Sequence, residues 1–512
     1  MRRLLVVFAV ALAAAPPAAT ARFSLVAARP AARPLLTLSG GRELAPELGL
    51  WRVPTALVPQ LRTAGLVRYA QPDRLLRPAA ATRSLVDPFV AQEWWLPDIG
   101  ATQATPPGPG VPITVIDTGV DVAHPEFAGR TNTVLLNTQS TTDTNEDFHG
   151  TAVSSVAAAP ENGVGIVGVY PQAVLREYDA DLSGRLSDSD LIAAIETALS
   201  TGPSVINLSL GGTVFDQALQ DVIYSAIRRG SLVVAASGNS REEGNPANFP
   251  ADMSHVLTVA ATDQNDRSAF FSSSSFGVDL AAPGVGILAA VPVRYAASGF
   301  ATVDGTSFST PIVAAAAAWV WTVRPTLDQT QLFDVMRLSA RDVEGTGFDA
   351  ETGFGILDIP HALTITEPAK DPQEPNDDVD LVKPGRLFAT GTAPLTTPTK
   401  RTATVHARLD FTEDPDDVYR VWVPAGQTVT VTVSARAKLA LQLWRPTTRT
   451  VQEQGAAKRR DLAATVTRTA TKATLGVTNT TKKGGFYYAD VFAQTGNPSY
   501  DLTVKTSKPA KR

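Results

Sequence analysis

Three side chains in this sequence could together carry out nucleophilic catalysis. Asp117 ends an apolar run, His149 opens a stretch of small residues, and Ser307 lies just before an Ala-rich stretch. A serine hydroxyl becomes an effective nucleophile when a neighbouring base removes its proton. Histidine suits this task because its reference pKa lies near neutrality, and a carboxylate can fix the imidazole tautomer and stabilise its protonated form. These residue types predict acyl transfer on Ser307.

Each of these residues alone has a simpler explanation. An aspartate at a strand end is usually a cap or turn residue, a lone histidine is more often structural, and a serine at a helix start is usually an N-cap. Ser307 nevertheless occupies a favourable place, because free backbone N–H groups at a helix start stabilise developing negative charge. Pro311 is compatible with the first turn of that helix, where no intrahelical N–H is lost. We interpret the three residues together as catalytic.

The short motifs around these residues carry a family resemblance. They are Asp-Thr-Gly at 117–119, His-Gly-Thr at 149–151 and Gly-Thr-Ser-x-x-x-Pro at 305–311. In this order they resemble the three signatures of the subtilisin-like serine proteases, peptidase family S8. Two positions differ from the usual pattern: Ala152 stands where a second histidine is common, and Phe308 where methionine is usual. Neither position supplies a catalytic group.

The resemblance covers about residues 85–365 and implies a serine endopeptidase that forms an acyl-enzyme on Ser307. It implies Asp117 and His149 as the other members of the catalytic triad. It also implies Asn239, which follows an apolar run in Ala-Ala-Ser-Gly-Asn, as a side-chain donor to the oxyanion beside the backbone N–H of Ser307. A turn asparagine is the simpler alternative for Asn239.

Two segments, Val205–Gly212 and Ala236–Gly238, resemble the walls of the family's substrate cleft, where an extended peptide pairs with backbone groups. A plain core strand is the simpler interpretation of the first segment, and it is partly true because Ile206 and Leu208 should pack inward. The resemblance also places one asparagine at the base of the primary pocket. The implied substrate-binding residues are Ser209, Leu210, Gly211, Ala236, Ser237, Gly238 and Asn248.

The same resemblance suggests a structural calcium ion and no cofactor for the chemistry. The calcium ligands would include Gln92, Glu126 and Asn162. Backbone carbonyls of the loop 160–166 could complete the shell, because Ca²⁺ requires several oxygen ligands. Solvated surface groups are the alternative interpretation.

Hydrophobic patterns predict how the site is positioned. Short apolar runs, typical of strands buried on both faces of a parallel sheet, alternate with helical patterns. This alternation predicts a doubly wound, mostly parallel α/β domain, subtilisin-like by resemblance, with ligands at the carboxyl ends of its strands. The predicted strands are 113–116, 205–210, 232–236 and 256–260, and the predicted helices are 190–199, 215–228, 309–323 and 329–338.

The region before this domain contains two further segments. Arg2 and Arg3, a short apolar run and a final Ala-Thr-Ala predict a signal peptide over 1–21, because the apolar run is too short to span a membrane. Residues 22–84 resemble the family's inhibitory propeptide, a small α+β domain. The resemblance implies that it is an intramolecular inhibitor, which Ser307 would cleave from a zymogen.

The region after the catalytic domain also has two parts. An acidic, Pro-containing stretch predicts a linker over 366–397. Three stretches, Asp371–Asp377, Asp416–Val421 and Gly485–Tyr488, resemble the bacterial pre-peptidase C-terminal domain. This resemblance implies a small β-sandwich over residues 398–512. The alternation of Thr and Val over 428–433 is typical of antiparallel strands with one solvated face.

Composition narrows the function further. The chain has 512 residues, no cysteine and a formal net charge of −5. It can form no disulfide and has no thiol nucleophile, and its small charge gives no reason to expect nucleic-acid binding. We expect a secreted, extracellular monomer that acts on polypeptides. From residue 400 onward 19 Lys and Arg outnumber 9 Asp and Glu, so this region could contact anionic cell-envelope or extracellular polymers, or simply present a solvated face.

Two other functions are compatible with parts of the sequence. The first is an inactive fold that serves as a secreted binding or adhesion module; the complete set of catalytic residue types disfavours it. The second is an esterase with a serine nucleophile. The common esterase fold has Ser before Asp and His, within a G-x-S-x-G turn, and Ser307 has neither feature.

Overall fold

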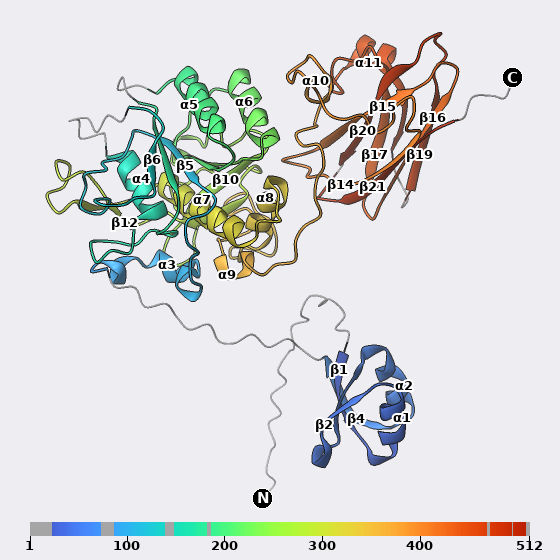
Figure 1. Cartoon of the computed structure of the whole chain (residues 1–512), viewed down its shortest axis with the longest axis horizontal. Coiled ribbons are helices and arrows are strands. Elements are labelled where there is room, and N and C mark those ends of the chain that lie inside the picture. Colours follow the sequence, from blue (N-terminus) through green and yellow to red (C-terminus); the bar gives the residue numbers. More distant parts are fainter. Residues whose placement is uncertain are drawn as a thin grey trace, which may run out of the picture. The chain divides into compact units, whose positions relative to one another are not determined.

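The computed structural model describes residues 23–72, 87–138, 148–181, 186–467, 472–493 and 495–507. The chain divides into two compact units, Met1–Ala81 and Thr82–Arg512 (Figure 1). The predicted signal peptide, 1–21, lies outside the described residues.

The first unit is a small α+β fold. Its antiparallel sheet has the order β2-β3-β1-β4. Val26, Trp51 and Val53 of the sheet pack with Leu36 and Leu61 of the helices, because both elements present one apolar face. The elements are β1 (Phe23–Ala28), α1 (Arg33–Leu38), β2 (Arg42–Ala45), β3 (Leu50–Pro54), α2 (Val58–Thr63) and β4 (Val67–Pro72).

The second unit contains a seven-stranded parallel sheet in the order β11-β10-β9-β8-β5-β7-β6. The order reverses around β5, as expected for a doubly wound sheet. The strands are β5 (Ile113–Asp117), β6 (Thr133–Leu135), β7 (Leu175–Asp179), β8 (Val205–Leu208), β9 (Leu232–Ala236), β10 (Val256–Thr262) and β11 (Leu280–Pro283).

Helices cover both faces of this sheet (Figure 1). Val205 packs with the helices of one face, whereas Ile206 and Leu208 pack with those of the other, so β8 is buried on both sides. The predicted doubly wound α/β fold is therefore confirmed. One face carries α4 (His149–Ala158) and α7 (Thr306–Val323), and the other face carries α5 (Asp188–Ser200) and α6 (Gln217–Arg228). The remaining elements of this domain are α3 (Trp95–Asp98), β12 (Ile287–Ala290), β13 (Phe300–Val303), α8 (Gln329–Leu338) and α9 (Ile359–Ala362).

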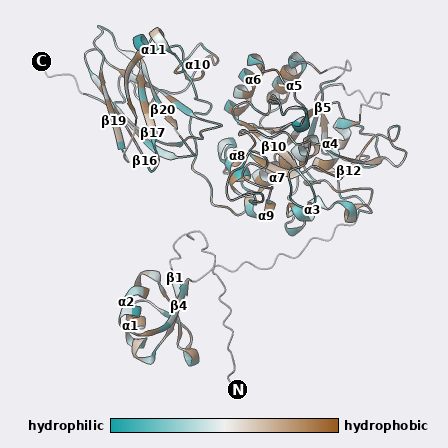
Figure 2. Ribbon diagram, turned by 180° about the vertical axis from the view of Figure 1, so that it is seen from behind, coloured by the Kyte–Doolittle hydropathy of each residue, from teal (hydrophilic) through white to brown (hydrophobic). Residues whose placement is uncertain are grey.

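Helix α7 is the central helix of the core. It is the one helix among the described residues that is long and apolar enough to cross a membrane, but 78% of it is buried inside the protein. Ala314 to Ala318 are fully buried, and small side chains let α4 approach closely. Figure 2 shows hydrophobic colouring along α7 and the neighbouring strands, while α5 and α6 also carry hydrophilic segments. We interpret α7 as a core helix.

The C-terminal part of the second unit is a β-sandwich. Its two antiparallel sheets have the orders β14-β21-β16-β19 and β15-β20-β17-β18. Val429, Val431 and Val433 point into the core and the intervening threonines toward solvent, as the sequence predicts. The elements are β14 (Thr402–Arg408), β15 (Asp416–Val423), β16 (Thr428–Ala435), β17 (Leu439–Trp444), α11 (Gly455–Asp461), β18 (Leu462–Thr467), β19 (Lys472–Thr478), β20 (Gly485–Ala493) and β21 (Ser499–Thr506).

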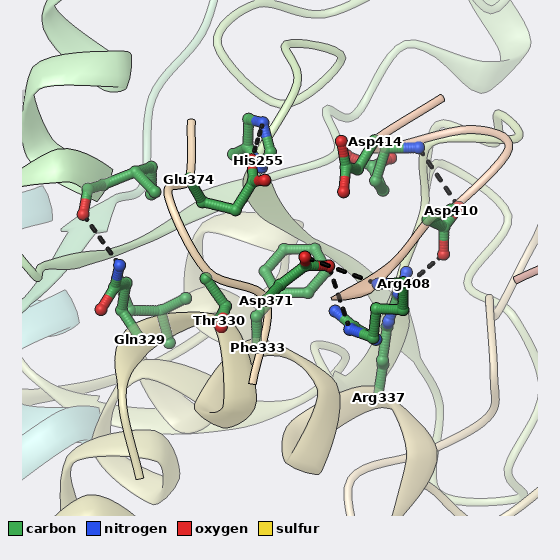
Figure 3. Close-up of a pocket in the computed structure, with 13 residues that line it drawn as sticks. His255, Gln329, Thr330, Phe333, Arg337, Asp371, Glu374, Arg408, Asp410 and Asp414 are labelled. Carbon is green, nitrogen blue, oxygen red and sulfur yellow. Dashed lines mark hydrogen bonds and ion pairs between the residues drawn. The ribbon is translucent and has the colours of Figure 1, made fainter. Parts of the chain in front are cut away.

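The segment 366–397, predicted as a linker, packs in part against the sandwich. It contains the short helix α10 (Val379–Val382), whose Val379 and Val382 pack against Trp444 and Tyr488 of the sandwich. Two acidic residues of the segment, Asp371 and Glu374, are also buried (Figure 3). The segment is packed because its apolar residues bury surface that an acidic, Pro-containing composition does not reveal.

Candidate active site

The four predicted catalytic residues lie at the carboxyl edge of the parallel sheet or at helix starts. Asp117 is the last residue of β5, and Asn239 follows β9 by three positions. His149 is the first residue of α4, and Ser307 is the second residue of α7. Crevices at this edge are where open α/β sheets bind ligands.

A short hydrogen bond joins the first two of these residues. Nδ1 of His149 lies 2.7 Å from Oδ1 of Asp117, whose side chain is 3% exposed. The backbone N–H of Thr118 donates to the same carboxylate oxygen at 2.8 Å. Because the proton on Nδ1 is held by the carboxylate, the neutral imidazole has its lone pair on Nε2.

The turn after β5 fixes the position of His149. Thr118 Oγ1 accepts a hydrogen bond from the N–H of Gly150 at 3.0 Å, which ties the strand end to the helix start. A Cβ at Gly150 would lie 2.2 Å from the carbonyl oxygen of Gly119, so only glycine permits this approach. The His-Gly pair is therefore required by packing as well as by chemistry.

The environment of His149 changes its acidity. Burial lowers the pKa of His149, while the charge of Asp117 and the hydrogen bond to it raise the pKa, and the net result is a pKa above the ordinary 6.5. The protonated imidazolium is thus stabilised where a general base would need it.

Ser307 and Ser209 form a reciprocal pair across the cleft. Ser209 Oγ donates to the carbonyl of Ser307 at 2.8 Å, and Ser307 Oγ donates to the carbonyl of Ser209 at 3.3 Å. In this arrangement the Ser307 hydroxyl faces the Ser209 carbonyl and not His149. The ring of His149 lies 5.6 Å from the ring of Phe308, the residue after Ser307. Catalytic hydrogen bonds often form only in the substrate complex.

The reciprocal pair has a cause in the sequence of α7. The helix begins at Thr306, so Pro311 lies inside it and not in its first turn, which corrects that expectation. Proline has no N–H, and an interior proline deprives the carbonyl four residues earlier of its helical donor. That carbonyl belongs to Ser307, and Ser209 supplies the missing donor.

Asn239 is oriented by the residue before the candidate nucleophile. Its Oδ1 accepts from both the N–H and the Oγ1 of Thr306, each at 2.9 Å. With the carbonyl oxygen engaged in this way, the amide NH₂ group remains available as a donor. Asn239 is exposed, at the surface of the cleft.

The structure brings the predicted cleft residues together. Asn248 Nδ2 donates to the carbonyl of Ala236 at 2.8 Å, and a Cβ at Gly211 would lie 2.5 Å from its amide. A Cβ at Gly238 would lie 3.2 Å from Cγ of Asn248. Asn248 therefore lies between the two walls, and Ser237, the remaining member of the second wall, is buried and bonded to the carbonyl of Ser273.

A hollow continues from the catalytic residues along the first wall. It is lined by Asp117 and His149, by Ser209, Leu210 and Gly211, and by apolar side chains beyond them. Phe249 and Val214 belong to this apolar part, and both are accessible from solvent. The hollow can accept an apolar side chain of an extended peptide.

Of the predicted calcium ligands, Glu126 and Asn162 lie together and Gln92 does not join them. Asn162 Nδ2 donates to the carbonyl of Glu126 at 3.1 Å. Gln92 is exposed, whereas the buried Asp87 accepts from the N–H groups of Asn162 and Gly163 at 3.2 and 2.9 Å. Asp87, and not Gln92, is therefore the residue from this part of the chain that contacts the loop of Asn162.

Three functional neighbours were missed in the sequence. They are Thr306, which orients Asn239; Thr118, which anchors the helix of His149; and Asp87. The first two belong to the quoted motifs, so the motifs themselves were the available signal. Asp87 lies close to the predicted Gln92 in sequence, and its acidic oxygens are better ligands for Ca²⁺ than an amide.

Comparisons with known proteins find related proteases. The peptidase S8 model, described as the subtilase family, matches residues 108–355. Subtilisin BL from Lederbergia lenta is 36% identical over 242 residues, which cover 47% of this chain and 86% of the relative. Thermitase from Thermoactinomyces vulgaris is 39% identical over 239 residues, which cover 45% of this chain and 83% of the relative.

A solved structure is also similar. The psychrophilic subtilisin-like protease Apa1 from Pseudoalteromonas sp. AS-11 aligns with a TM-score of 0.49 and 19% identity, over 54% of this chain and 99% of that protein. The match in sequence already defines the class: the chain belongs to the subtilase family. It is a serine endopeptidase, and its chemistry requires no cofactor.

The Ser209–Ser307 pair predicts a rescue between two substitutions. In a Ser307→Ala background, which keeps the carbonyl, Ser209→Ala should lower the melting temperature by about 2–6 °C because a buried acceptor loses its donor. Adding Pro311→Ala supplies a backbone N–H and should restore most of this loss. Thermal unfolding of the single and double variants, with Pro311→Ala alone as control, measures the effect. A double variant no more stable than Ser209→Ala would contradict the explanation.

Proposed function

We propose that Asp117, His149 and Ser307 form the catalytic triad of a secreted endopeptidase that is made as a zymogen. The observation that carries this proposal is the 2.7 Å hydrogen bond between His149 Nδ1 and the buried carboxylate of Asp117. It leaves Nε2 of His149 as the base on the side of the cleft. Membership in the subtilase family and the place of Ser307 at the start of α7 support the same assignment.

In the proposed mechanism the Ser307 hydroxyl turns from the carbonyl of Ser209 to His149. Nε2 accepts its proton as Oγ attacks the peptide carbonyl, and Asp117 stabilises the imidazolium. The amide of Asn239 and the N–H of Ser307 donate to the oxyanion. The imidazolium then protonates the leaving amine, which leaves an acyl-enzyme, and a water molecule hydrolyses this ester by the same route.

We propose that the substrate binds as an extended strand between the two walls of the cleft. Ser209, Leu210 and Gly211 would pair with its backbone on one side, and Ala236, Ser237 and Gly238 would form the opposite wall. Asn248 would close the base of the primary pocket. Its hydrogen bond to the Ala236 carbonyl supports this role, because it fixes a polar group between the walls.

A structural calcium ion is part of the proposal. Asp87, Glu126 and Asn162 supply oxygen ligands of the kind that Ca²⁺ prefers. Glu126 is fully buried and its Oε1 has no hydrogen-bond partner among the described residues, so the donor set fits a cation. Burial raises the pKa of Glu126 to about 8, and bound calcium would offset this cost of ionisation. Glu126→Gln should remove this ion, so calorimetric titration with CaCl₂ should show one binding event fewer for Ser307→Ala/Glu126→Gln than for Ser307→Ala alone.

The catalytic assignment can be tested with a fluorophosphonate probe. The matured protein should be labelled covalently, because the probe reacts with an activated serine, and Ser307→Ala should not be labelled. Ser309→Ala, two residues further along the same helix, is the matched control and should keep its label. An unlabelled matured protein would instead indicate an inactive binding module.

The wild type and Ser307→Ala also test whether the protein is made as a zymogen. Residues 22–84 form our proposed inhibitor, and cleavage between its described part and Trp94 would release the mature enzyme. Intact mass and N-terminal sequencing should show this cleavage in the wild type and an uncleaved chain for Ser307→Ala. Loss of the segment from Ser307→Ala in the absence of any other protease would exclude self-processing.

The acidity of His149 predicts the pH dependence. The imidazole must be neutral to act as base, so kcat/KM should fall as the pH decreases through the pKa of His149. Because that pKa is raised, the midpoint of the acidic limb should lie above 6.5. Asp117→Asn removes the charge that raises it, so the midpoint should move to lower pH, and kcat should fall by about 10⁴-fold.

A control variant distinguishes the effect of the Asp117 charge on the pH midpoint from that of any negative charge near the cleft. Asp188 lines the same hollow but is exposed, so solvent screens its charge. Asp188→Asn should leave the midpoint nearly unchanged. An equal shift in both variants, or a wild-type midpoint at or below 6.5, would contradict the assignment of the acidic limb to His149.

Secretion and contact with anionic polymers complete the proposal. The predicted signal peptide and the surplus of basic residues after residue 400 support them. On fractionation of cells that express the chain, activity should be found outside the cytoplasm, and salt should release any fraction that adheres to the envelope. Activity confined to the cytoplasm would rule out secretion, and adherence that salt does not weaken would rule out the charge-based contact.

A further inference from the structure

The imidazole of His149 lies among aromatic side chains that the mechanism above does not use. Its ring centroid lies 5.6 Å from that of Phe308, at an interplanar angle of 48°, and 6.4 Å from that of Phe148, at 66°. Both distances fall in the range of about 4.5–7 Å over which aromatic rings attract one another. Phe308 directly follows Ser307, and Phe148 directly precedes His149, so both rings adjoin residues that would react.

A third ring supports Phe148. The ring of Tyr295 stacks on the ring of Phe148, with centroids 4.3 Å apart and planes inclined by 28°. Tyr295 is 42% exposed, so it covers Phe148 with part of its ring and meets solvent with the rest. Phe148 is half-buried and packs against the main core of the catalytic domain. Its ring is therefore held by the core and by Tyr295 together.

The turn that carries Tyr295 is tied to the helix that carries His149. This turn joins β12 to β13, and β12 lies beside α4 (Figure 1). Oγ of Ser155, in α4, accepts a hydrogen bond from the N–H of Ala290, the last residue of β12, at 2.9 Å. The N–H of Tyr295 donates to the carbonyl of Pro292 at 2.7 Å, which closes the turn. Because Phe148 directly precedes α4, both rings of the stack are anchored to the same helix.

Phe308 is held by the core itself. It is 4% exposed and belongs to the main hydrophobic cluster of the catalytic domain. Methionine, which is usual at this position in the family, is unbranched and has three rotatable bonds. A phenyl ring is rigid by comparison. This chain therefore has a rigid neighbour beside the imidazole where a flexible one is usual.

The imidazole needs such neighbours because one hydrogen bond does not fix a ring. The bond from Nδ1 to Asp117 holds a single atom, and the ring can still rock about that atom. The side chain of His149 is 26% exposed, so part of it borders the open cleft. Rocking displaces Nε2, which must reach the hydroxyl of Ser307, and a misplacement of about 1 Å can cost roughly 10²-fold in rate.

We propose that Phe148 and Phe308 are positioning residues that hold the His149 imidazole with Nε2 toward Ser307, and that Tyr295 acts through Phe148. The inference rests on the proposed catalytic triad. The three side chains Phe148, Tyr295 and Phe308, here called the aromatic clamp, take up no proton in the mechanism and touch no reacting atom. They act through His149.

The clamp acts on position and not on charge. Its rings are uncharged at neutral pH, and the carboxylate bonded to the imidazole is that of Asp117. Asp188, which lines the same hollow, is exposed and screened by solvent. Loss of a clamp ring should therefore lower kcat, while the acidic midpoint of kcat/KM stays where the pair of Asp117 and His149 sets it.

Kinetics of the matured protein test the clamp. Phe308→Leu keeps an apolar side chain but removes the ring, so kcat should fall by about 3–10-fold with little change in KM. Phe148→Leu should act in the same way, and Phe148→Tyr, which keeps the ring, should restore kcat. Phe300→Leu is the matched control, because Phe300 lies in β13 but its ring contacts that of His124, at 5.4 Å, so kcat should stay unchanged.

A double-mutant cycle tests the role of Tyr295. Tyr295→Leu should lower kcat in the wild type, whereas Tyr295→Phe, which keeps the stack, should not. In the Phe148→Leu background, Tyr295→Leu should have no further effect, because the ring through which it acts is gone. Additive losses would contradict this route.

A measurement that needs no activity separates the clamp from the proposed function. The chain has five histidines, so the spectrum of a ¹⁵N-histidine-labelled Ser307→Ala protein is simple. The Nδ1–H resonance of His149 is the one that Asp117→Asn removes. Phe308→Leu and Phe148→Leu should each broaden it through faster exchange with water, because the imidazole moves more freely. Phe300→Leu should leave it sharp.

The outcomes distinguish the two proposals. If the wild type is not labelled by the fluorophosphonate probe but the resonance still broadens in Phe308→Leu, the proposed function fails and the restraint on the ring stands. An unchanged kcat and resonance in both leucine variants would overturn the clamp. So would a fall of the acidic midpoint equal to that of Asp117→Asn, or an equal loss of kcat in Phe300→Leu. The half-buried Phe148 keeps these tests available if Phe308→Leu folds poorly.

Discussion

A carboxylate that is 3% exposed must be paired to remain charged, and the active site is built around the pairing of Asp117 with His149. The carboxylate is held by β5, which pairs with β7 and β8 on its two sides and cannot move independently of the sheet. The imidazole is held by the start of α4, which is bound through Gly150 to the turn after β5. The sheet thereby fixes the orientation of the base, and Ser307 only has to reach it.

Much of this arrangement could be predicted, because buried strands and amphipathic helices leave periodic patterns in the sequence. The predicted strand 232–236 and helix 329–338 coincide with β9 and α8, and other ends differ by a few residues. The start of α7 was predicted at 309 and lies at 306. The difference has a tertiary cause: Ser209 replaces the hydrogen bond that Pro311 removes, and no local pattern records a contact between residues 98 positions apart.

Ligand sets and buried acids were predicted less well, for a related reason. Gln92 was proposed as a calcium ligand by its place in the sequence, yet it is exposed, and the nearby Asp87 turns inward to the loop of Asn162. The acidic, Pro-containing composition of 366–397 predicted a linker and gave no sign of its packing. Composition cannot distinguish a carboxylate in water from one packed against His255 and Arg408, because these partners come from distant parts of the chain.

The second unit thus meets the same electrostatic constraint at opposite edges of one sheet. At the carboxyl edge, a single buried aspartate is balanced by an imidazole whose charge can change, which is what proton transfer requires. At the amino edge, four other carboxylates lie near Glu374, with fewer cationic side chains beside them. Burial and the neighbouring carboxylates there raise the pKa of Glu374 well above its ordinary value, so the amino edge favours neutral carboxyls where the carboxyl edge favours a charged pair. Because the two groups lie at opposite edges of the sheet, the packing of the sandwich and proton transfer in the cleft use different side chains.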